Sequence, residues 1–110
     1  MKRWLLCLLL VAACFSQTAG NYSSVPDITP GGTAVAITPG VHTYSRMIQI
    51  NALSTNTGLV RWGGPNIGAS QGAFIAAGFG QCICNTTSDL STLYVYAAGS
   101  DKVTVSWQNY

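Results

Sequence analysis

Few side chains of this 110-residue chain could perform acid–base chemistry, because it contains three Asp, one His and no Glu. Such catalysis needs titratable groups that converge. His42 and Asp89 could form a Ser–His–Asp arrangement with a serine, but the nucleophile elbow G-x-S-x-G does not occur. Asp89 and Asp101 fall in expected turns, where aspartate serves local hydrogen bonding. We therefore expect no catalytic site, and we expect His42 to face solvent.

Four cysteines offer sulfur chemistry in two separate regions. Cys7 and Cys14 lie in an apolar N-terminal segment, whereas Cys82 and Cys84 have C-x-C spacing in the body. Zinc and redox sites use C-x-x-C spacing, so Cys82, Cys84 and His42 do not predict a metal site. Residues i and i+2 of a strand share a face with Cα atoms roughly 6.5 Å apart, near the limit for a disulfide. Two buried reduced thiols are the favoured interpretation, and a disulfide, which export would favour, is the alternative.

The first 19 residues differ from the rest of the chain in composition. A basic dipeptide precedes the apolar run 4–15, and small polar residues follow it. The run is shorter than the roughly 20 residues that span a bilayer, and the pattern is typical of a secretory signal peptide. Cleavage after Ala19 is one alternative, and lipidation of Cys14 is another, because the sequence VAAC at 11–14 resembles a bacterial lipobox. The third alternative is an uncleaved apolar helix in which residues 4–15 contact a partner or a membrane.

The body, residues 20–110, carries no net charge. Its three cations and three anions are Arg46, Arg61, Lys102, Asp27, Asp89 and Asp101. It has no basic stripe to neutralise phosphates, so we expect no binding of nucleic acid. The glycines match no phosphate-binding motif, and no cofactor is expected. An uncharged small domain lacks the repulsion that keeps proteins monomeric, so we expect it in an assembly.

Residue patterning in the body indicates strands throughout. Short β-branched and aromatic runs alternate with clusters of Gly, Pro, Asn and Ser, and no 3.6-residue repeat lasts three turns. We predict seven strands, at 33–38, 43–51, 59–62, 73–77, 81–85, 92–97 and 103–107. Residues 21–32 are expected to be an extended lead-in, and 86–89 a turn. The sequence therefore predicts an all-β domain, a small antiparallel β-sandwich or jelly-roll-like domain, behind the N-terminal apolar helix.

Alternation within the strands predicts which side chains are buried. The candidate core consists of Leu53, Leu59, Ile75, Ile83, Leu93, Val95 and Trp107. In strand 43–51, the side chains expected on one face are Tyr44, Arg46, Ile48 and Ile50. If Leu93 and Val95 face the core, then Tyr94 and Tyr96 face outward. With Trp62 they form the candidate interface, because exposed aromatic side chains are typical of protein interfaces and of sugar-binding platforms.

Four motifs follow one another between residues 48 and 107. They read ALSTNTGLVRWGG (52–64), GAFIAAGFG (72–80), DLSTLYVYAAGS (89–100) and VTVSW (103–107). In these motifs the chain resembles a group of small β-proteins encoded by tailed bacteriophages, which are virion-associated structural or head-decoration components. The signal-like N-terminus and the C-x-C spacing are not part of that pattern. The resemblance implies a non-enzymatic protein located in the virion, with virion proteins or further copies of itself as partners.

Two other functions remain open at this point. The same domain fits an exported, periplasmic or outer-membrane lipoprotein that acts as an envelope binding module. It also fits a carbohydrate-binding accessory domain. Neither alternative requires a cofactor or a metal ion.

Overall fold

The computed structural model describes residues 22–109, and in that range it contains eight strands and no helix. The strands are β1 (Tyr22–Ser24), β2 (Val35–Ala36), β3 (Tyr44–Ala52), β4 (Val60–Gly63), β5 (Ala73–Ile75), β6 (Gly80–Asp89), β7 (Tyr94–Tyr96) and β8 (Val103–Gln108). Seven of them fall on the predicted segments. The eighth, β1, lies in the predicted lead-in and pairs with β8. The expected N-terminal helix lies outside the described residues.

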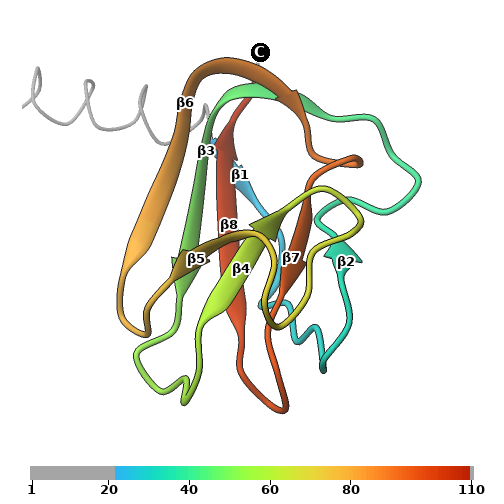
Figure 1. Ribbon diagram of the computed structural model, residues 1–110. Coiled ribbons are helices and arrows are strands. Elements are labelled where there is room, and N and C mark those ends of the chain that lie inside the picture. Colours follow the sequence, from blue (N-terminus) through green and yellow to red (C-terminus); the bar gives the residue numbers. More distant parts are fainter. Residues whose placement is uncertain (1–21, 110) are drawn as a thin grey trace, which may run out of the picture.

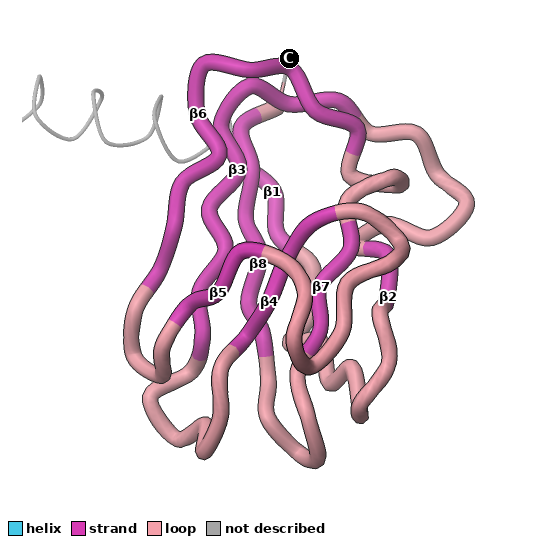
Figure 2. Tube along the Cα trace, in the orientation of Figure 1, coloured by secondary structure: helices cyan, strands magenta, loops and turns pink. Residues whose placement is uncertain are grey.

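The strands form two four-stranded antiparallel sheets, β1-β8-β3-β6 and β2-β7-β4-β5. Figure 1 shows the second sheet in front of the first, and Figure 2 shows loops gathered at both ends of the strands. The pairs β4–β5, β3–β6, β2–β7 and β1–β8 follow one another outward from the β4–β5 loop, so the whole chain has the pairing of one long hairpin. Successive pairs lie in alternate sheets, so the hairpin is rolled up on itself. The predicted all-β class with two antiparallel sheets is confirmed.

Both sheets contribute to one hydrophobic core. The buried apolar side chains are Ile37, Ile48, Ile50, Ala52, Val60, Ile75, Leu90, Val95, Ala97, Val103, Val105 and Trp107. The predicted core residues Ile75, Val95 and Trp107 are among them, and Leu53, Ile83 and Leu93 are half-buried. The prediction for Leu59 is wrong, since it is 43% exposed. Strand β4 begins one residue later than predicted, and Val60 takes the inward position instead.

A β-bulge interrupts the pairing of β3 with β6. Ser45 pairs with Ser88 and Met47 pairs with Cys84, so three residues of β6 lie opposite Arg46. Bulges of this kind bend the strand and locally disrupt the ladder of hydrogen bonds. The fully buried Ser45 hydroxyl compensates in part, because it accepts a hydrogen bond from the Met47 N–H at 3.2 Å.

The bulge overturns two predictions. Residues 86–89, expected to form a turn, belong to β6. The predicted face of strand 43–51 is correct for Ile48 and Ile50, which are buried, but wrong for Tyr44 and Arg46, which are exposed. The alternation slips at the bulge, and no Gly or Pro in the sequence marks its position.

Candidate functional site

The outer face of the β2-β7-β4-β5 sheet carries aromatic side chains and one cation. Tyr96 pairs with Arg61 across β7 and β4, and Arg61 pairs with Phe74 across β4 and β5. Directly opposite residues point to the same face, so these three form one row across three strands. Val95 is fully buried, so Tyr94 and Tyr96 on either side of it point away from the core. We call the surface formed by these two tyrosines, Arg61 and Phe74 the aromatic face.

Arg61 is fixed at the centre of the aromatic face. Its Nε donates to the Ala69 carbonyl at 3.1 Å, and its Nη1 donates to the Gly72 carbonyl at 2.9 Å. Its guanidinium carbon lies 5.7 Å from the centre of the Phe74 ring, within the range of a cation–π interaction. These contacts are all with uncharged groups, so a charge is held in place among aromatic rings.

Phe74 is a residue of this face that sequence reasoning did not single out. It is 63% exposed. Its neighbour Ile75 was predicted to be buried, and adjacent residues of a strand point to opposite faces. That alternation is the signal that could have found Phe74.

Trp62 does not belong to the aromatic face, although its residue type predicted a common surface with Tyr94 and Tyr96. It pairs with Val95, and it packs against the hydrophobic core. Its indole N–H donates to the side-chain oxygen of Gln81 at 3.1 Å, which links the two sheets. The grouping rested on residue type, and strand alternation separates Trp62 from the tyrosines.

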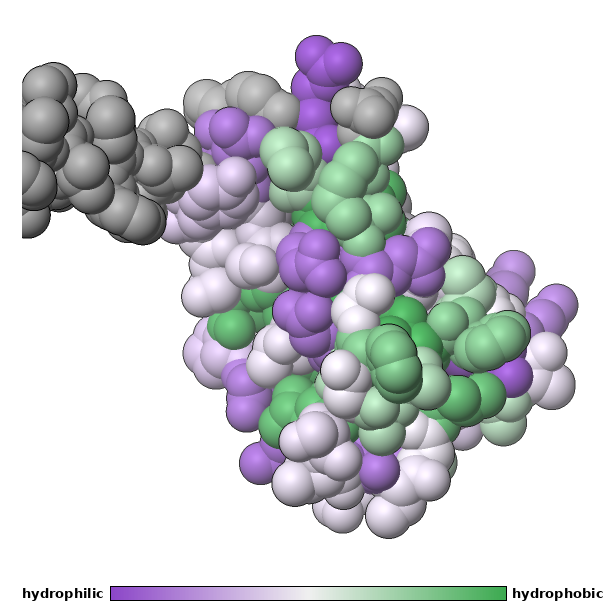
Figure 3. Space-filling view, turned by 90° about the vertical axis from the view of Figure 1, so that its left-hand side faces the viewer, coloured by the Kyte–Doolittle hydropathy of each residue, from purple (hydrophilic) through white to green (hydrophobic). Residues whose placement is uncertain are grey.

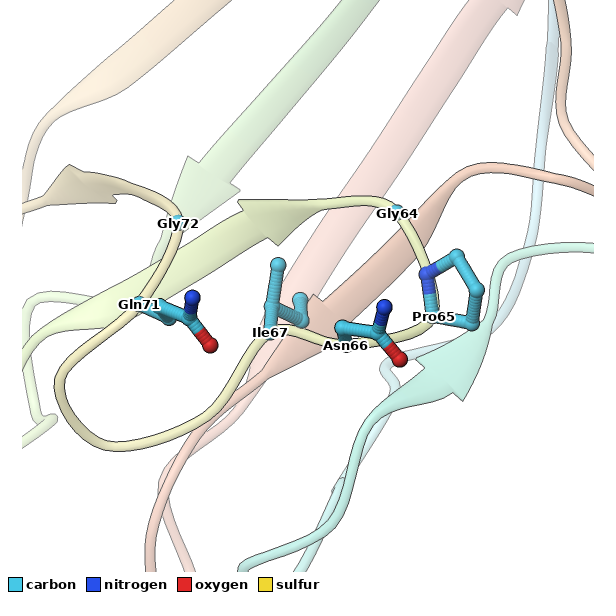
Figure 4. Close-up of a pocket in the computed structure, with 6 residues that line it drawn as sticks. All are labelled: Gly64, Pro65, Asn66, Ile67, Gln71 and Gly72. Atoms are coloured by element: carbon cyan, nitrogen blue, oxygen red, sulfur yellow. The ribbon is translucent and has the colours of Figure 1, made fainter.

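The loop between β4 and β5 encloses a small hollow beside the aromatic face (Figure 4). Its volume is about 190 Å³, and it is lined by Gly64, Pro65, Asn66, Ile67, Gln71 and Gly72. The side-chain amides of Asn66 and Gln71 are able to donate and accept hydrogen bonds there. The hollow is smaller than the roughly 300–1,000 Å³ typical of small-molecule sites.

The outer face of the other sheet is lined by short polar side chains. Gln49 lies opposite Cys82 on one side and Ser106 on the other, and Asn51 lies opposite Thr104. The Gln49 amide nitrogen donates to the Asn51 amide oxygen at 3.0 Å. We call this surface, together with Cys82, Cys84 and Met47 beside it, the polar face.

Cys82 and Cys84 form a disulfide on the polar face, with their Cα atoms 5.5 Å apart. The favoured prediction was a pair of reduced thiols, and the structure instead contains the disulfide that was the alternative. The expected burial is also wrong, since Cys82 is exposed and Cys84 is half-buried. Both residues lie in β6, at the edge of its sheet. Met47 of β3 lies opposite Cys84.

His42, Asp89 and Ser91 lie together at one end of the molecule, but their geometry differs from that of a catalytic triad. His42 Nδ1 is 2.7 Å from Asp89 Oδ2, and Ser91 Oγ lies 3.2 Å from the same ring nitrogen. In a triad the serine contacts the opposite nitrogen, Nε2. Here the Ser91 hydroxyl instead donates to Asp89 Oδ1 at 2.8 Å. The His42 side chain is 73% exposed, as predicted.

Asp89 acts as an anchor for the surrounding backbone. Its hydrogen bond with His42 holds the pKa of this carboxyl well below its usual value, and bonds from Ser91 and the Thr43 N–H act in the same direction. The ionised carboxylate therefore ties the segment before β3 to the end of β6. The arrangement supports structure and offers no activated nucleophile.

Asp101 has a similar role at the opposite end, where the β3–β4 and β7–β8 loops lie side by side (Figure 1). Its side chain is 6% exposed, and it accepts the backbone N–H groups of Thr57 and Gly58, both at 2.9 Å. The hydrogen bond from the Thr57 N–H is the main cause that holds the pKa of Asp101 below its usual value, and the bond from the Gly58 N–H acts in the same direction. Asn56 donates to the Lys102 carbonyl at 2.8 Å and accepts the Lys102 N–H at 2.9 Å. The STNTG motif at 54–58 thus joins two loops.

Comparison of the chain with protein-family models, with characterised proteins and with solved structures gives no match. Within residues 22–109, no helix has the length and hydrophobicity needed to cross a membrane. In that same part of the chain, no three His, Cys, Asp or Glu side chains are grouped to hold a metal ion. Cys14 and the apolar run 4–15 lie outside the described residues, so their roles stay predictions.

Proposed function

We propose that this chain is a non-enzymatic structural or accessory protein of a tailed bacteriophage, which assembles onto the virion as a head-decoration or tail-associated component. The observation that carries the proposal is the row of Tyr96, Arg61 and Phe74 across three strands of one outer face. Aromatic and arginine side chains are enriched in protein interfaces and supply much of their binding energy. The partner is a virion protein or a second copy of this chain.

The topology supports this proposal. A long hairpin rolled into two four-stranded sheets favours the jelly-roll alternative over a simple sandwich, and jelly rolls occur in viral capsid and lectin domains. Folds of this kind have many different functions, so the topology agrees with a virion component without specifying one.

The sheet edges on one side of the molecule also favour assembly. β5 and β6 are edge strands of the two sheets, and no charged residue occurs between Arg61 and Asp89. Phe74 and Phe79 on this side are 63% and 68% exposed. Figure 3 faces this side and shows apolar side chains over much of its right-hand part. Monomeric proteins commonly protect sheet edges with charge, so uncharged edges suit a protein whose edges are covered in an assembly.

The decisive experiment places a charge on the aromatic face without disturbing the core. We expect Tyr96→Lys to remain folded and to lose assembly, seen as its absence from purified virions or a shift to monomer in light scattering. Two tyrosines buried at the centre of an interface contribute roughly 2–4 kcal/mol, enough to change affinity by orders of magnitude. Thr104→Lys, on the polar face of the other sheet, is the matched control and should assemble normally.

Two results would contradict the proposal. If Tyr96→Lys unfolds the domain, the tyrosine contributes to packing and is unavailable to a partner. If Tyr96→Lys assembles as well as Thr104→Lys, the interface lies elsewhere. Circular dichroism separates the first result from a loss of assembly, because a folded variant keeps its sheet spectrum.

One observation favours an exported lipoprotein or envelope binding module as a second candidate. Disulfides form and persist in oxidising compartments, and Cys82 and Cys84 form one. The intact mass of the natural protein distinguishes the two functions. Retention of residues 1–19 agrees with assembly in the virion, whereas loss of residues 1–13 with added lipid mass on Cys14 establishes the lipoprotein.

A carbohydrate-binding role is the weaker candidate, and the hollow in Figure 4 is the feature that favours it. The amides of Asn66 and Gln71 could bind sugar hydroxyl groups. Binding of a monosaccharide that is lost in Asn66→Ala and Gln71→Ala would support this role.

A further inference from the structure

Three sulfur-containing residues are neighbours on the polar face, and their grouping is independent of the proposed function. Cys82 and Cys84 lie on the same side of β6, with Cα atoms 5.5 Å apart. Met47 of β3 is the direct cross-strand partner of Cys84. Such partners have Cβ atoms about 4.5–5.5 Å apart. Met47 is 41% exposed, and Cys82 is exposed as well, so an ion from solvent can reach the group.

We propose that Cys82, Cys84 and Met47 bind one soft monovalent metal ion, Cu(I) in its chemistry, when the disulfide is reduced. Thiolate and thioether sulfur are soft ligands, which favour Cu(I) and also Zn²⁺ and iron–sulfur clusters. The two cysteines lie on the same side of β6 with their Cα atoms 5.5 Å apart, so both thiolates can reach one ion. The methionine side chain has three rotatable bonds, so its sulfur can move over the pair to complete a three-sulfur site.

Opening the site is a two-electron reduction. Two external thiols each give up one electron and one proton and become joined in a disulfide. The Cys82–Cys84 bond breaks, and each sulfur becomes a thiol. Binding of Cu(I) then displaces the two thiol protons, forms two metal–thiolate bonds and adds the Met47 thioether as a neutral ligand. The oxidised protein offers no thiolate, so the site exists only in the reduced state.

The donors around the group favour Cu(I) over Zn²⁺. Structural zinc sites use four Cys, His or carboxylate ligands. The neighbours that face the sulfurs across β3 and β8 are amide and hydroxyl side chains, of which Gln49 and Ser106 lie nearest in the register. Within residues 22–109 no His, Asp or Glu joins the two cysteines in a metal-binding group. Strand pairing, rather than spacing in the sequence, supplies the third ligand.

The test uses the full-length chain carrying Cys7→Ser and Cys14→Ser, so that Cys82 and Cys84 are its only thiols. The protein is reduced with dithiothreitol, freed of the reductant and titrated with Cu(I) without oxygen, in competition with bicinchoninate. We expect one Cu(I) per chain and three sulfur neighbours in X-ray absorption. Met47→Leu should weaken binding by about tenfold or more and leave two sulfur neighbours. Gln49→Leu, which changes the partner of Cys82 without removing sulfur, should leave both readouts unchanged.

Several outcomes would overturn the proposal. One is a reduced protein that fails to bind Cu(I) at one ion per chain. Another is a Met47→Leu variant with the same affinity and the same number of sulfur neighbours. Displacement of Cu(I) by equimolar Zn²⁺ would also overturn it. Met47 is partly exposed, so its leucine variant should fold, and circular dichroism checks that a lost site is not a lost fold.

Discussion

The aromatic face and the polar face occupy equivalent positions on two four-stranded sheets, yet they carry different kinds of side chain. The first presents Tyr96, Arg61 and Phe74, which are large side chains in one row across three strands. The second presents amides such as Gln49 and Asn51, which hydrogen-bond to each other. The inner faces of both sheets serve one core. The difference between the outer faces is one of side-chain type, and the aromatic face is the one whose composition is typical of protein interfaces.

The largest effect should separate the inner side of a strand from its outer side. Ile50 of β3 is fully buried, and its neighbour Gln49 lies on the polar face. We expect Ile50→Ala to lower the free energy of unfolding by about 2–5 kcal/mol, because it leaves a cavity in the shared core. Gln49→Ala should cost less than about 1 kcal/mol. Urea denaturation measures both, and similar costs would show that the polar face is more deeply packed than its side chains indicate.

A second pair of variants compares Gly72, which directly precedes β5, with Gly80, the first residue of β6. At Gly72 (φ +112°), an added Cβ would lie 2.9 Å from Ile67 Cγ2 and 3.1 Å from the Trp62 carbonyl oxygen. Gly72→Ala should therefore cost about 1–3 kcal/mol. At Gly80 the three atoms nearest to an added Cβ belong to the amide groups of Asn51 and Gln49, which are side-chain ends that can move. Gly80→Ala should therefore lower the free energy of unfolding by less than Gly72→Ala does. Thermal unfolding measures both variants, and a lower melting temperature for Gly80→Ala than for Gly72→Ala would refute this order.

The disulfide of the polar face should contribute little to stability. It closes a loop of sequence separation two, and loop-closure entropy for so short a loop corresponds to about 1–2 kcal/mol. We expect the double variant Cys82→Ala/Cys84→Ala to remain folded, with its urea midpoint only slightly lower than that of the oxidised protein. An unfolded double variant would mean that the bridge is essential to β6.

The smallest effect at neutral pH concerns the two carboxylates at opposite ends of the sheets, because it appears only in acid. Asp89 and Asp101 both have pKa values below the ordinary 3.8. Ionisation of each group therefore stabilises the fold fully above pH 3.8, and that stabilisation is lost as the pH falls through the lower folded pKa. Urea midpoints should therefore fall as the pH drops below about 4. Asp101→Asn should flatten the acid part of this curve, and an unchanged slope would exclude Asp101 as a contributor.

The sequence by itself determined the all-β class, the approximate positions of seven of the eight strands and part of the burial. Alternation in VTVSW put Val103, Val105 and Trp107 on one side of a strand, and all three are buried. Clusters of Gly, Pro, Asn and Ser located most turns, because these residues have local backbone preferences that need no tertiary partner. The zero net charge of residues 20–110 also follows from the sequence alone.

Tertiary structure decided which strands pair, and therefore which side chains meet. The bulge opposite Arg46, the separation of Trp62 from Tyr96 and the meeting of Met47 with Cys84 all depend on strand register. The STNTG turn showed its hydrogen-bonding residues in the sequence, but its partner Asp101 lies 43 or more residues away. The register between distant strands is set by the packing of the whole core. A local pattern in one segment of the chain therefore does not specify which residue of a distant strand it will contact.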